Sequence, residues 1–304
     1  MSAPYLSVII CTYNRQKFIG ECLACLSRQT LDKSLWEFIV VDNNSTDGTA
    51  VIVKDFIKNN AEIQASYVFE AQQGLSFARN RGINEAKGAI IIYIDDDVET
   101  VPIYLETIHN FFRTHPTAVG MGGKTLPKYS ECPKPDWISP YLAGITGTID
   151  RGDQMRKFTP KMKYPSGCNM IYTKDILIKA GGFNNELKAR ADDKYIFQQV
   201  KKISSEVWYV PEAFSLHNID AKRLTFDSFK KLYLKGGNEE RILTRSEGMM
   251  SVLKKGMELF AKTIVGIGLW LAYFLKRKGL QGKYIFLSQW FTLKGFFQKE
   301  VIVR

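Results

Sequence analysis

The chain has 304 residues, of which 45% are hydrophobic and 24% charged, and this composition is that of an ordinary globular protein and not of a low-complexity chain. Its length suits one large α/β domain with an appendage. The 42 Lys and Arg residues exceed the 31 Asp and Glu residues, so the formal net charge is +11. This excess favours anionic partners, namely nucleotide phosphates, anionic lipid or nucleic acid, and much of it lies after residue 220.

The N-terminus and the cysteines indicate a cytosolic protein. No basic stretch precedes the first apolar run, so we expect no secretory signal. The five cysteines are scattered, and an odd number in a chain this long indicates reduced thiols. Cys22 and Cys25 have the spacing of a redox or zinc motif, but no second Cys/His pair at ligand spacing accompanies them. We therefore expect them to pack inside a helix.

Strands and helices alternate through the first hundred residues. Apolar strands are predicted over residues 6–11, 37–41, 67–69 and 90–94. This alternation predicts a parallel sheet with right-handed crossovers, and it places Thr12, Asp42 and Asp95 along one edge of that sheet.

Helices are predicted between these strands. The first runs to about residue 29, with Asn14 as a candidate cap, and the second begins near Thr46. The second helix is expected to bury Val51, Ile52 and Phe56, and a third follows Gly74.

The elements after residue 100 are less regular. We expect a helix over residues 102–114, strands over 119–123 and 207–210, a return to ordered structure over 164–172, and helices from 174 and over 192–203. The proline-rich stretch 124–163 is predicted to be an acceptor-side flap, because long loops in compact domains are usually functional or mobile. We do not expect a domain boundary within it.

The strand that begins at Ile90 ends in three acids, Asp95, Asp96 and Asp97, here called the acidic triplet. Its uninterrupted aliphatic run suits a strand that is covered on both faces, and ligands bind at the carboxyl ends of such strands. Three adjacent carboxylates repel one another, and their hard oxygen atoms suit Mg²⁺ or Mn²⁺. The alternative is a solvated acidic turn.

A second polar string follows the strand that ends at Val41. It runs from Asp42 to Gly48 and offers a carboxylate and several amides, which can bind a ribose hydroxyl or a base imide. Neither a dinucleotide-type glycine fingerprint nor a Gly-x-x-x-x-Gly-Lys loop is present. A diphosphate would therefore need a metal, which the acidic triplet can hold.

Four motifs in order resemble those of a family 2 glycosyltransferase with the GT-A fold. They are Ser7–Arg15 (SVIICTYNR), Val40–Thr49 (VVDNNSTDGT), Gly74 with Ala78–Gly82 (ARNRG), and Ile94–Asp97 (IDDD). Gly181–Asn184 and Ala191–Asp193 extend the resemblance to about residue 220. It implies an α/β fold with a mostly parallel, Rossmann-like central sheet, helices on both faces, and here a C-terminal helical appendage.

The resemblance implies roles for individual residues. Thr12, Tyr13 and Asp42 would hold the nucleoside of the donor, and Arg79 would lie near its base or phosphates. The acidic triplet matches the Asp-x-Asp motif, whose last acid usually contacts the metal. The full set of implied donor-binding residues is Thr12, Tyr13, Asn14, Asp42, Asn44, Arg79, Asp95 and Asp96. The implied ligands of Mn²⁺ or Mg²⁺ are Asp97, Asp95 and His217.

The catalytic base is implied to lie at Asp193 or Asp192. The family often has Glu-Asp here, so Asp192 is a departure, and Tyr195 stands where a further Asp often lies. Such a carboxylate would take the proton of the acceptor hydroxyl on the side opposite the leaving group, whose charge a metal neutralises. This arrangement predicts one-step displacement with inversion. Inverting glycoside hydrolysis follows a parallel logic.

The tail after residue 220 mixes basic and apolar residues. Residues 222–241 are predicted to form an amphipathic helix packed on the catalytic domain. The run Phe260–Leu275 is uncharged only from Thr263, about thirteen residues, which is shorter than the ~20 that a spanning helix needs. With the apolar segment Tyr284–Phe297 and the cluster Lys276–Lys278, this pattern predicts attachment at a membrane surface. A helical hairpin buried in a dimer or on the core is the alternative.

Together these patterns predict a catalytic domain over 1–220, with a nucleotide-binding half (1–100) and an acceptor half (101–220), and a tail over 221–304. The predicted activity is metal-dependent, inverting transfer of a hexose or N-acetylhexosamine from a nucleotide sugar, most simply a UDP-sugar. The acceptor would be a hydroxyl of a glycan or lipid-linked molecule in cell-surface polysaccharide synthesis. The protein would be cytoplasmic and peripheral on the inner face of the plasma membrane, and a homodimer stays open.

Two other functions stay open on the sequence. A nucleotidyltransferase acting on sugar phosphates would share the sheet and the acidic site, although its usual glycine-rich, basic start is absent. A non-catalytic basic scaffold or nucleic-acid-binding protein would explain the charge. No nucleic-acid reading motif is present, so we expect no nucleic-acid partner.

Overall fold

The structure is a computed structural model that describes residues 5–159, 162, 164–187, 191–245 and 247–298. Its contacts group into two compact units. The sheet unit comprises Met1–Lys128, Gly147–Lys188 and Asp192–Asn218. The helical unit comprises Tyr129–Thr146, Ala189–Ala191 and Ile219–Arg304.

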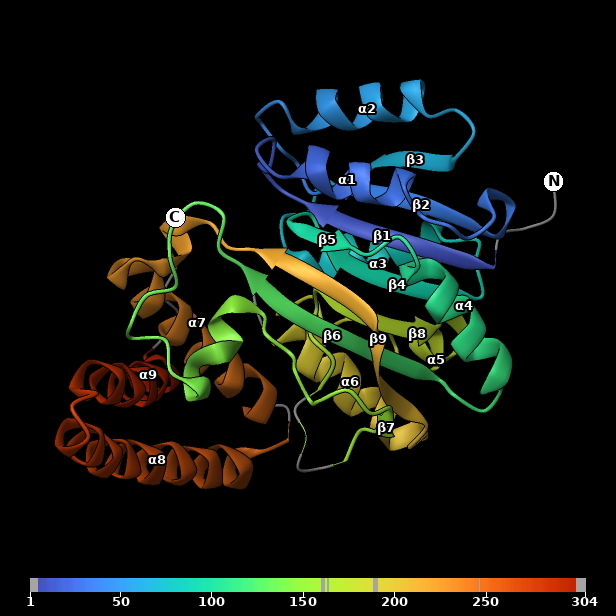
Figure 1. The fold of residues 1–304 in the computed structure, drawn as a ribbon. Coiled ribbons are helices and arrows are strands. Elements are labelled where there is room, and N and C mark those ends of the chain that lie inside the picture. The colour runs from blue at the N-terminus through green and yellow to red at the C-terminus, as the bar shows by residue number, and fades with distance from the viewer. Residues whose placement is uncertain (1–4, 160–161, 163, 188–190, 246, 299–304) are drawn as a thin grey trace. The chain divides into compact units, whose positions relative to one another are not determined.

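The first half of the sheet unit is the predicted parallel βα repeat (Figure 1). Its strands pair in the order β3-β2-β1-β4, and every pair in this set is parallel. The strands are β1 (Leu6–Thr12), β2 (Trp36–Asp42), β3 (Gln64–Phe69) and β4 (Ile90–Asp95). The crossover helices are α1 (Ile19–Ser27), α2 (Thr49–Asn59) and α3 (Leu75–Glu85).

The second half makes the sheet mixed. β8 pairs antiparallel with β4, and the order continues through β6, β9 and β5, while the short β7 pairs with β9. These strands are β5 (Val98–Thr100), β6 (Gly120–Lys128), β7 (Arg156–Lys157), β8 (Asn169–Thr173) and β9 (Val207–Asn218). The helices are α4 (Tyr104–Thr114), α5 (Lys174–Lys179) and α6 (Asp192–Ile203).

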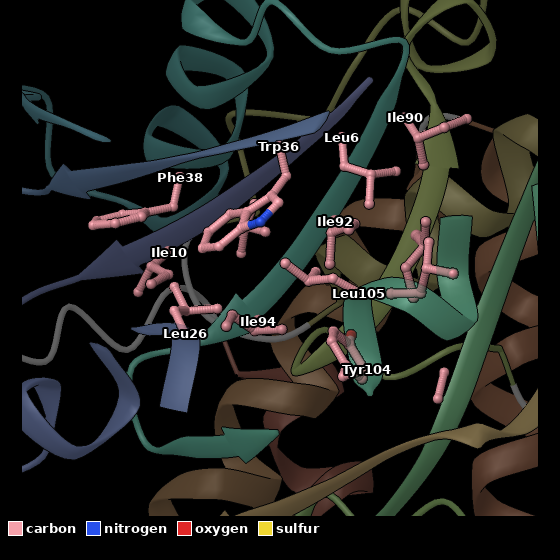
Figure 2. Packing of buried hydrophobic residues seen from close by; sticks show 14 of the residues in the cluster. Leu6, Ile10, Leu26, Trp36, Phe38, Ile90, Ile92, Ile94, Tyr104 and Leu105 are labelled. Atoms are coloured by element: carbon pink, nitrogen blue, oxygen red, sulfur yellow. The ribbon is translucent and has the colours of Figure 1, made fainter. Parts of the chain in front are cut away.

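The core lies on both faces of this sheet. Along β4, Ile90, Ile92 and Ile94 enter one hydrophobic cluster, whereas Ile91 and Tyr93 enter the other. Figure 2 shows the first cluster, in which Trp36, Leu105 and Tyr104 pack beside the isoleucines. Because both faces are covered, a continuous aliphatic strand is stable here, as the sequence predicts.

Several local expectations are wrong. Helix α1 begins at Ile19 with Phe18 at its N-cap and no side-chain cap, so Asn14 does not cap it. In α2, Val51 is exposed and Val53 fills the core position instead. The short β5 and the length of β9 were not predicted, because their pairing joins segments that are more than a hundred residues apart.

The helical unit has its own aromatic core. It contains the short 3₁₀ turns η2 (Pro140–Thr146) and η3 (Ala221–Leu224), and the helices α7 (Phe226–Arg245), α8 (Met249–Leu275) and α9 (Gly279–Phe297). Trp137 stacks on Tyr284 with ring centroids 4.6 Å apart and meets Phe229 edge-on at 5.4 Å. The middle of the predicted flap, Tyr129–Thr146, therefore packs with the tail helices, and unit boundaries fall inside the stretch 124–163.

Glycines allow α7 and α9 to approach closely. A Cβ on Gly237 would collide with the backbone of Thr292, and one on Gly295 would collide with the backbone of Leu234. Gly236, the neighbour of Gly237, faces open space. Backbone-to-backbone packing of these two helices therefore depends on Gly237 and Gly295.

Among the described residues, α8 is the one helix that is long and apolar enough to cross a membrane, judged by length and composition alone. Its most apolar 18-residue window has a mean hydropathy of 1.5, and 17% of that window is buried. Such a helix is weak support for a membrane span.

Candidate active site

Strand register brings three predicted site positions to one edge. Thr12 is paired with Asp42 across β1 and β2, and Cys11 is paired with Asp95 across β1 and β4. The carboxyl ends of these parallel strands therefore lie together, at the position where α/β sheets bind ligands.

The loop after β1 is tied to the loop after β2. Asn14 Oδ1 accepts a hydrogen bond from the Thr46 backbone at 2.8 Å, and the Ser45 hydroxyl accepts one from the Asn14 backbone at 2.9 Å. Asn14 and Asn44 have φ of 54° and 67°, a left-handed conformation that asparagine tolerates better than most residues. The structure thus gives Asn14 a loop-bracing role, while donor contacts by Asn14 and Asn44 stay predictions.

A pocket of about 200 Å³ opens at this edge. Its walls come from the loop after β1 and from the start of α3, and its lining includes Thr12, Tyr13, Asn43, Gln73 and Gly74. Tyr13 is exposed there, so its ring is available for stacking on a flat ligand.

Asn43 braces this pocket. Its Nδ2 donates to the Gln72 carbonyl at 2.7 Å, and its Oδ1 accepts from the Gly74 backbone at 2.8 Å. Gln73 donates in turn to the Asn43 carbonyl. Neither Asn43 nor Gln73 is among the individual site residues that the sequence predicts, and their place beside Asp42 and Gly74 is the signal that would have found them.

Asp42 is fully buried and precedes Asn43, which lines the pocket. Asp42 Oδ1 accepts from the Ser45 backbone at 2.9 Å, and Asp42 Oδ2 accepts from the Tyr67 hydroxyl at 2.7 Å. Burial and this hydrogen bond raise the pKa of Tyr67 to about 12. These two hydrogen bonds fix the Asp42 carboxylate at the end of β2, and its contact with a nucleoside stays a prediction.

The acidic triplet is held by arginines from two sides. Arg15 Nε donates to Asp96 Oδ1 at 2.8 Å, and Arg15 Nη2 donates to Asp97 Oδ2. On the other side, Arg79 Nη2 lies 3.6 Å from Asp95 Oδ1. The sequence predicts a cation at these carboxylates but does not identify Arg15 as their partner.

Burial governs the charges in this cluster. It raises the pKa of Asp96 to about 7, with Asp97 adding to the rise and Arg15 opposing it. Burial also acts to lower the pKa of Arg15, but Asp96 and Asp97 outweigh it and the net shift is upward. Arg15 therefore stays cationic against the triplet.

Asp95, Asp97 and His217 could hold a metal ion. One ligand atom from each lies within 4.8 Å of the other two, and His217 Nε2 is 3.0 Å from Asp97 Oδ1. Two carboxylates and one imidazole form a donor set that suits Mn²⁺, so the residues fit the ion that the sequence predicts.

A second group, Glu21, Cys25 and Glu99, meets the same distance criterion. Glu99 already accepts from Lys128 at 2.5 Å, and burial raises the pKa of the Cys25 thiol. We assign no ion to it, which agrees with the expectation that Cys22 and Cys25 pack within a helix, where both are buried.

Arg79 connects the acidic triplet to the start of α6. Its side chain is 3% exposed, and its guanidinium donates to Asp192, which is equally buried, and to the Gly167 carbonyl at 3.3 Å. It also lies over the rings of Tyr93 and Phe183. In the structure Arg79 is thus an internal ion-pair partner, and its predicted contact with the donor remains untested.

Asp193 differs from its neighbour Asp192. It is half-buried, and its carboxylate accepts from the backbone of Gly167 at 3.1 Å and of Lys194 at 2.7 Å. Of the two candidate bases, Asp192 is neutralised by Arg79, whereas Asp193 is the more accessible carboxylate.

Two cysteines near the cluster are poor nucleophiles. Burial raises the pKa of Cys11 and of Cys168 to about 12. Both thiols are therefore protonated at neutral pH, and the nucleophile of a thiolate mechanism is absent at these two positions.

Comparison with known proteins identifies the family. The family model of glycosyl transferase family 2 matches residues 7–181, more than half of the chain. The chain belongs to glycosyl transferase family 2. The predicted resemblance and the α/β, GT-A-like fold with its helical appendage are thereby confirmed.

Curated relatives agree with this assignment. Glycosyltransferase AglE of Haloferax volcanii is 32% identical over 196 residues, which is 62% of this chain and 59% of AglE. The glucosyl-dolichyl phosphate glucuronosyltransferase of the same organism is 25% identical over 193 residues, 63% of this chain and 59% of that protein. The chain thus spans about 59% of the length of these two relatives.

Solved structures share the fold. Mannosyltransferase PcManGT of Pyrobaculum calidifontis, in complex with GDP-Man and Mn²⁺, aligns with a TM-score of 0.66 at 17% identity, covering 99% of this chain and 89% of that one. S. aureus TarS 1-349 in complex with UDP-GlcNAc aligns with a TM-score of 0.58 at 17% identity, covering 98% and 94%. Two nucleotide-sugar-binding neighbours therefore have the same architecture.

Proposed function

We propose that this glycosyltransferase moves a sugar from a nucleotide-diphosphate sugar to a hydroxyl in one inverting step that depends on a divalent metal. The observation that carries the proposal is the chain of contacts from Asp95 through Arg79 to Asp192. It joins the acidic end of β4 to the start of α6, where Asp193 lies. These contacts support the proposal that the carboxylates of the candidate metal site and the candidate base act in one site.

Each residue has a distinct part in this mechanism. Asp95, Asp97 and His217 would hold Mn²⁺ or Mg²⁺, and the ion would neutralise the charge that develops on the departing diphosphate. Tyr13 and the pocket around Gln73 bind the nucleoside, so the sugar is oriented before reaction.

Asp193 accepts the proton of the acceptor hydroxyl as that oxygen attacks the anomeric carbon. Backbone N–H groups of Gly167 and Lys194 fix the direction of its carboxylate. Asp192 stays paired with Arg79, and this pairing leaves Asp193 as the single base. One base and one attack give inversion of the anomeric centre.

Paired substitutions test these roles. Asp193→Asn is expected to reduce kcat at least about 10²-fold, while donor binding, measured by calorimetry with a UDP-sugar and Mn²⁺, changes little. Asp97→Asn is expected to abolish Mn²⁺-dependent transfer. A product that keeps the donor's anomeric configuration, or full activity in Asp193→Asn, would refute the one-step mechanism. An Asp97→Asn protein that keeps full Mn²⁺-dependent transfer would refute the assignment of Asp97 as a metal ligand, and a wild type that transfers no sugar from any donor would favour a non-catalytic scaffold.

The donor and the acceptor are proposed from the relatives. UDP is favoured because TarS of Staphylococcus aureus, a poly(ribitol-phosphate) β-N-acetylglucosaminyltransferase, is 35% identical to this chain over 91 residues, and a TarS structure contains UDP-GlcNAc. A lipid-linked acceptor is favoured by the Haloferax relative that acts on a glucosyl-dolichyl phosphate. A donor screen that measures release of UDP, GDP or dTDP with Mn²⁺ distinguishes the nucleotides. The nucleotidyltransferase alternative loses its support, because the family is now known.

The helical unit is proposed to bind the surface of an anionic membrane through α8. Eight large apolar residues recur at alternating spacings of three and four along this helix, and each is 45–73% exposed. This α8 stripe consists of Met250, Leu253, Met257, Phe260, Ile264, Ile267, Leu271 and Phe274. An exposed apolar stripe of this length on one helix marks an interaction surface.

Charge favours lipid as the occupant of the stripe. Residues 222–304 contain 17 Lys and Arg against 6 Asp and Glu, so the tail carries the whole +11 and the rest of the chain is neutral. Lys276, Arg277 and Lys278 follow the stripe directly. Anionic headgroups attract such a segment at about 1 kcal/mol per nearby cation. We therefore propose that the protein lies on the cytoplasmic face of the plasma membrane. A role in the synthesis of a cell-surface glycan is part of the same proposal.

Vesicle sedimentation tests this attachment. The full chain is expected to pellet with vesicles of phosphatidylcholine and phosphatidylglycerol, and less with phosphatidylcholine alone. Ile264→Asp with Leu271→Asp is expected to abolish pelleting, whereas Val51→Asp, at an exposed apolar position of α2, is not. A protein that stays in the supernatant and forms a dimer that the double substitution dissociates would instead assign the stripe to a second copy.

A further inference from the structure

Arg15 bridges two carboxylates of the acidic triplet. It lies in the loop after β1, and its guanidinium contacts Asp96 and Asp97 at the end of the neighbouring β4. The planar fork of an arginine can serve two carboxylates at once, which the single ammonium of a lysine does less well. One of these partners, Asp97, also faces Asp95 and His217 in the candidate metal site.

The backbone around Arg15 holds it in this place. Its N–H donates to Thr49 Oγ1 at 2.9 Å, and Thr49 is fully buried. Its Cζ lies 4.7 Å from the centroid of the Phe18 ring, which shields one face of the guanidinium from water. The side chain is 25% exposed, so it is anchored yet borders solvent.

We propose that Arg15 is a positioning residue that serves as the resident counter-ion of the acidic triplet, and that a divalent ion binds by displacing its guanidinium from Asp97. This inference builds on the proposed metal-dependent transfer and concerns a residue to which that mechanism gives no role. Asp97 Oδ2 cannot bind both the guanidinium and a metal ion as strongly as it binds either cation alone. The metal-free site is therefore stabilised, and a metal alone binds weakly.

The same arrangement couples the metal to the nucleotide. A guanidinium released from Asp97 retains its charge and its free N–H donors beside the site, and a diphosphate offers them anionic oxygens. Nucleotide binding would then compensate for the lost Arg15–Asp97 contact. Metal and nucleotide should each tighten the binding of the other, and Arg15 should be responsible for part of that coupling.

Mn²⁺ binding to the full chain tests this role without any transfer reaction. Free Mn²⁺ is measured by electron paramagnetic resonance, with and without UDP, for the wild type, Arg15→Gln and Arg15→Lys. Arg15→Gln is expected to bind Mn²⁺ alone about tenfold more tightly, because the ion no longer competes with a cation. UDP should then tighten Mn²⁺ binding by a smaller factor than in the wild type, with Arg15→Lys between the two.

Controls separate this effect from charge and folding. Arg81→Gln removes an equal charge from an exposed pair with Glu85 and should leave Mn²⁺ affinity unchanged. Adding Asp97→Asn to Arg15→Gln should remove the gained affinity. In EDTA, Arg15→Gln should unfold at a lower urea concentration than the wild type, and Mn²⁺ should restore more stability to it. A merely structural ion pair would leave the Mn²⁺ affinity of Arg15→Gln unchanged or lower, and either result overturns the proposal.

The Mn²⁺-binding test of Arg15 can succeed or fail whether or not the protein transfers sugar. A wild type that transfers no sugar, while Arg15→Gln still gains Mn²⁺ affinity at Asp97, would end the proposed function and support the counter-ion role. A wild type that transfers sugar with Mn²⁺, while Arg15→Gln gains no affinity, would keep the proposed function and end the counter-ion role.

Discussion

Replacing Arg79 with Met should destabilise the sheet unit by about 3–5 kcal/mol, the usual cost of leaving a buried charge without its partner. Arg79 and Asp192 are each 3% exposed, so the Asp192 carboxylate would remain in a dry site without a neutralising cation. Met retains most of the apolar contact with the rings of Tyr93 and Phe183, so lost packing adds little. The effect is therefore electrostatic and should appear without any donor or metal.

Urea unfolding measures this loss in the full chain. Trp36 and Trp208 lie in the sheet unit, and replacing the other three tryptophans by Phe leaves them as the fluorescent reporters. With a slope of about 2–3 kcal/mol per molar urea, the expected loss lowers the midpoint by about 1–2.5 M. Arg81→Met, one helical turn from Glu85 on the exposed face of the same helix, should cost less than about 0.5 kcal/mol.

A second substitution identifies the cause. Adding Asp192→Leu to Arg79→Met removes the buried Asp192 carboxylate that has lost its cation, and should recover part of the lost stability. An Arg79→Met midpoint that differs from wild type no more than that of Arg81→Met would refute the buried-pair account. The link from the acidic triplet to α6 would then lose its physical basis.

Three further outcomes are expected. Gly237→Ala should destabilise the helical unit by about 1–3 kcal/mol because its Cβ meets the backbone of Thr292, whereas Gly236→Ala in the same helix should stabilise it by about 0.5–1 kcal/mol. The two are compared by thermal unfolding with Trp137, Trp270 and Trp290 as reporters. Tyr67→Phe should cost about 1–3 kcal/mol in urea, since it leaves buried Asp42 one hydrogen bond short; a neutral effect would mean that water replaces the hydroxyl. Gln73→Ala should weaken UDP binding severalfold in calorimetry without changing the urea midpoint, and equal affinity would place the nucleoside elsewhere.

Local sequence patterns determined the first half of the fold and the place of the candidate site. Apolar strands alternating with helices allow essentially one arrangement of short, right-handed crossovers, so the carboxyl ends of β1, β2 and β4 meet at one edge. Thr12, Asp42 and Asp95 lie there in register, as the sequence predicts. The ordered motifs also named the family.

The tertiary structure decided what those residues do to one another. The resemblance implied Asp193 as the base and left Asp192 as the alternative, and the tertiary structure pairs Asp192 with Arg79, more than a hundred positions away. The sequence likewise identified no partner for Arg15, because the end of β4 lies some eighty residues further along the chain. Ion pairs of this kind depend on burial and on contacts between distant segments, and neither is written in the local periodicity of a chain.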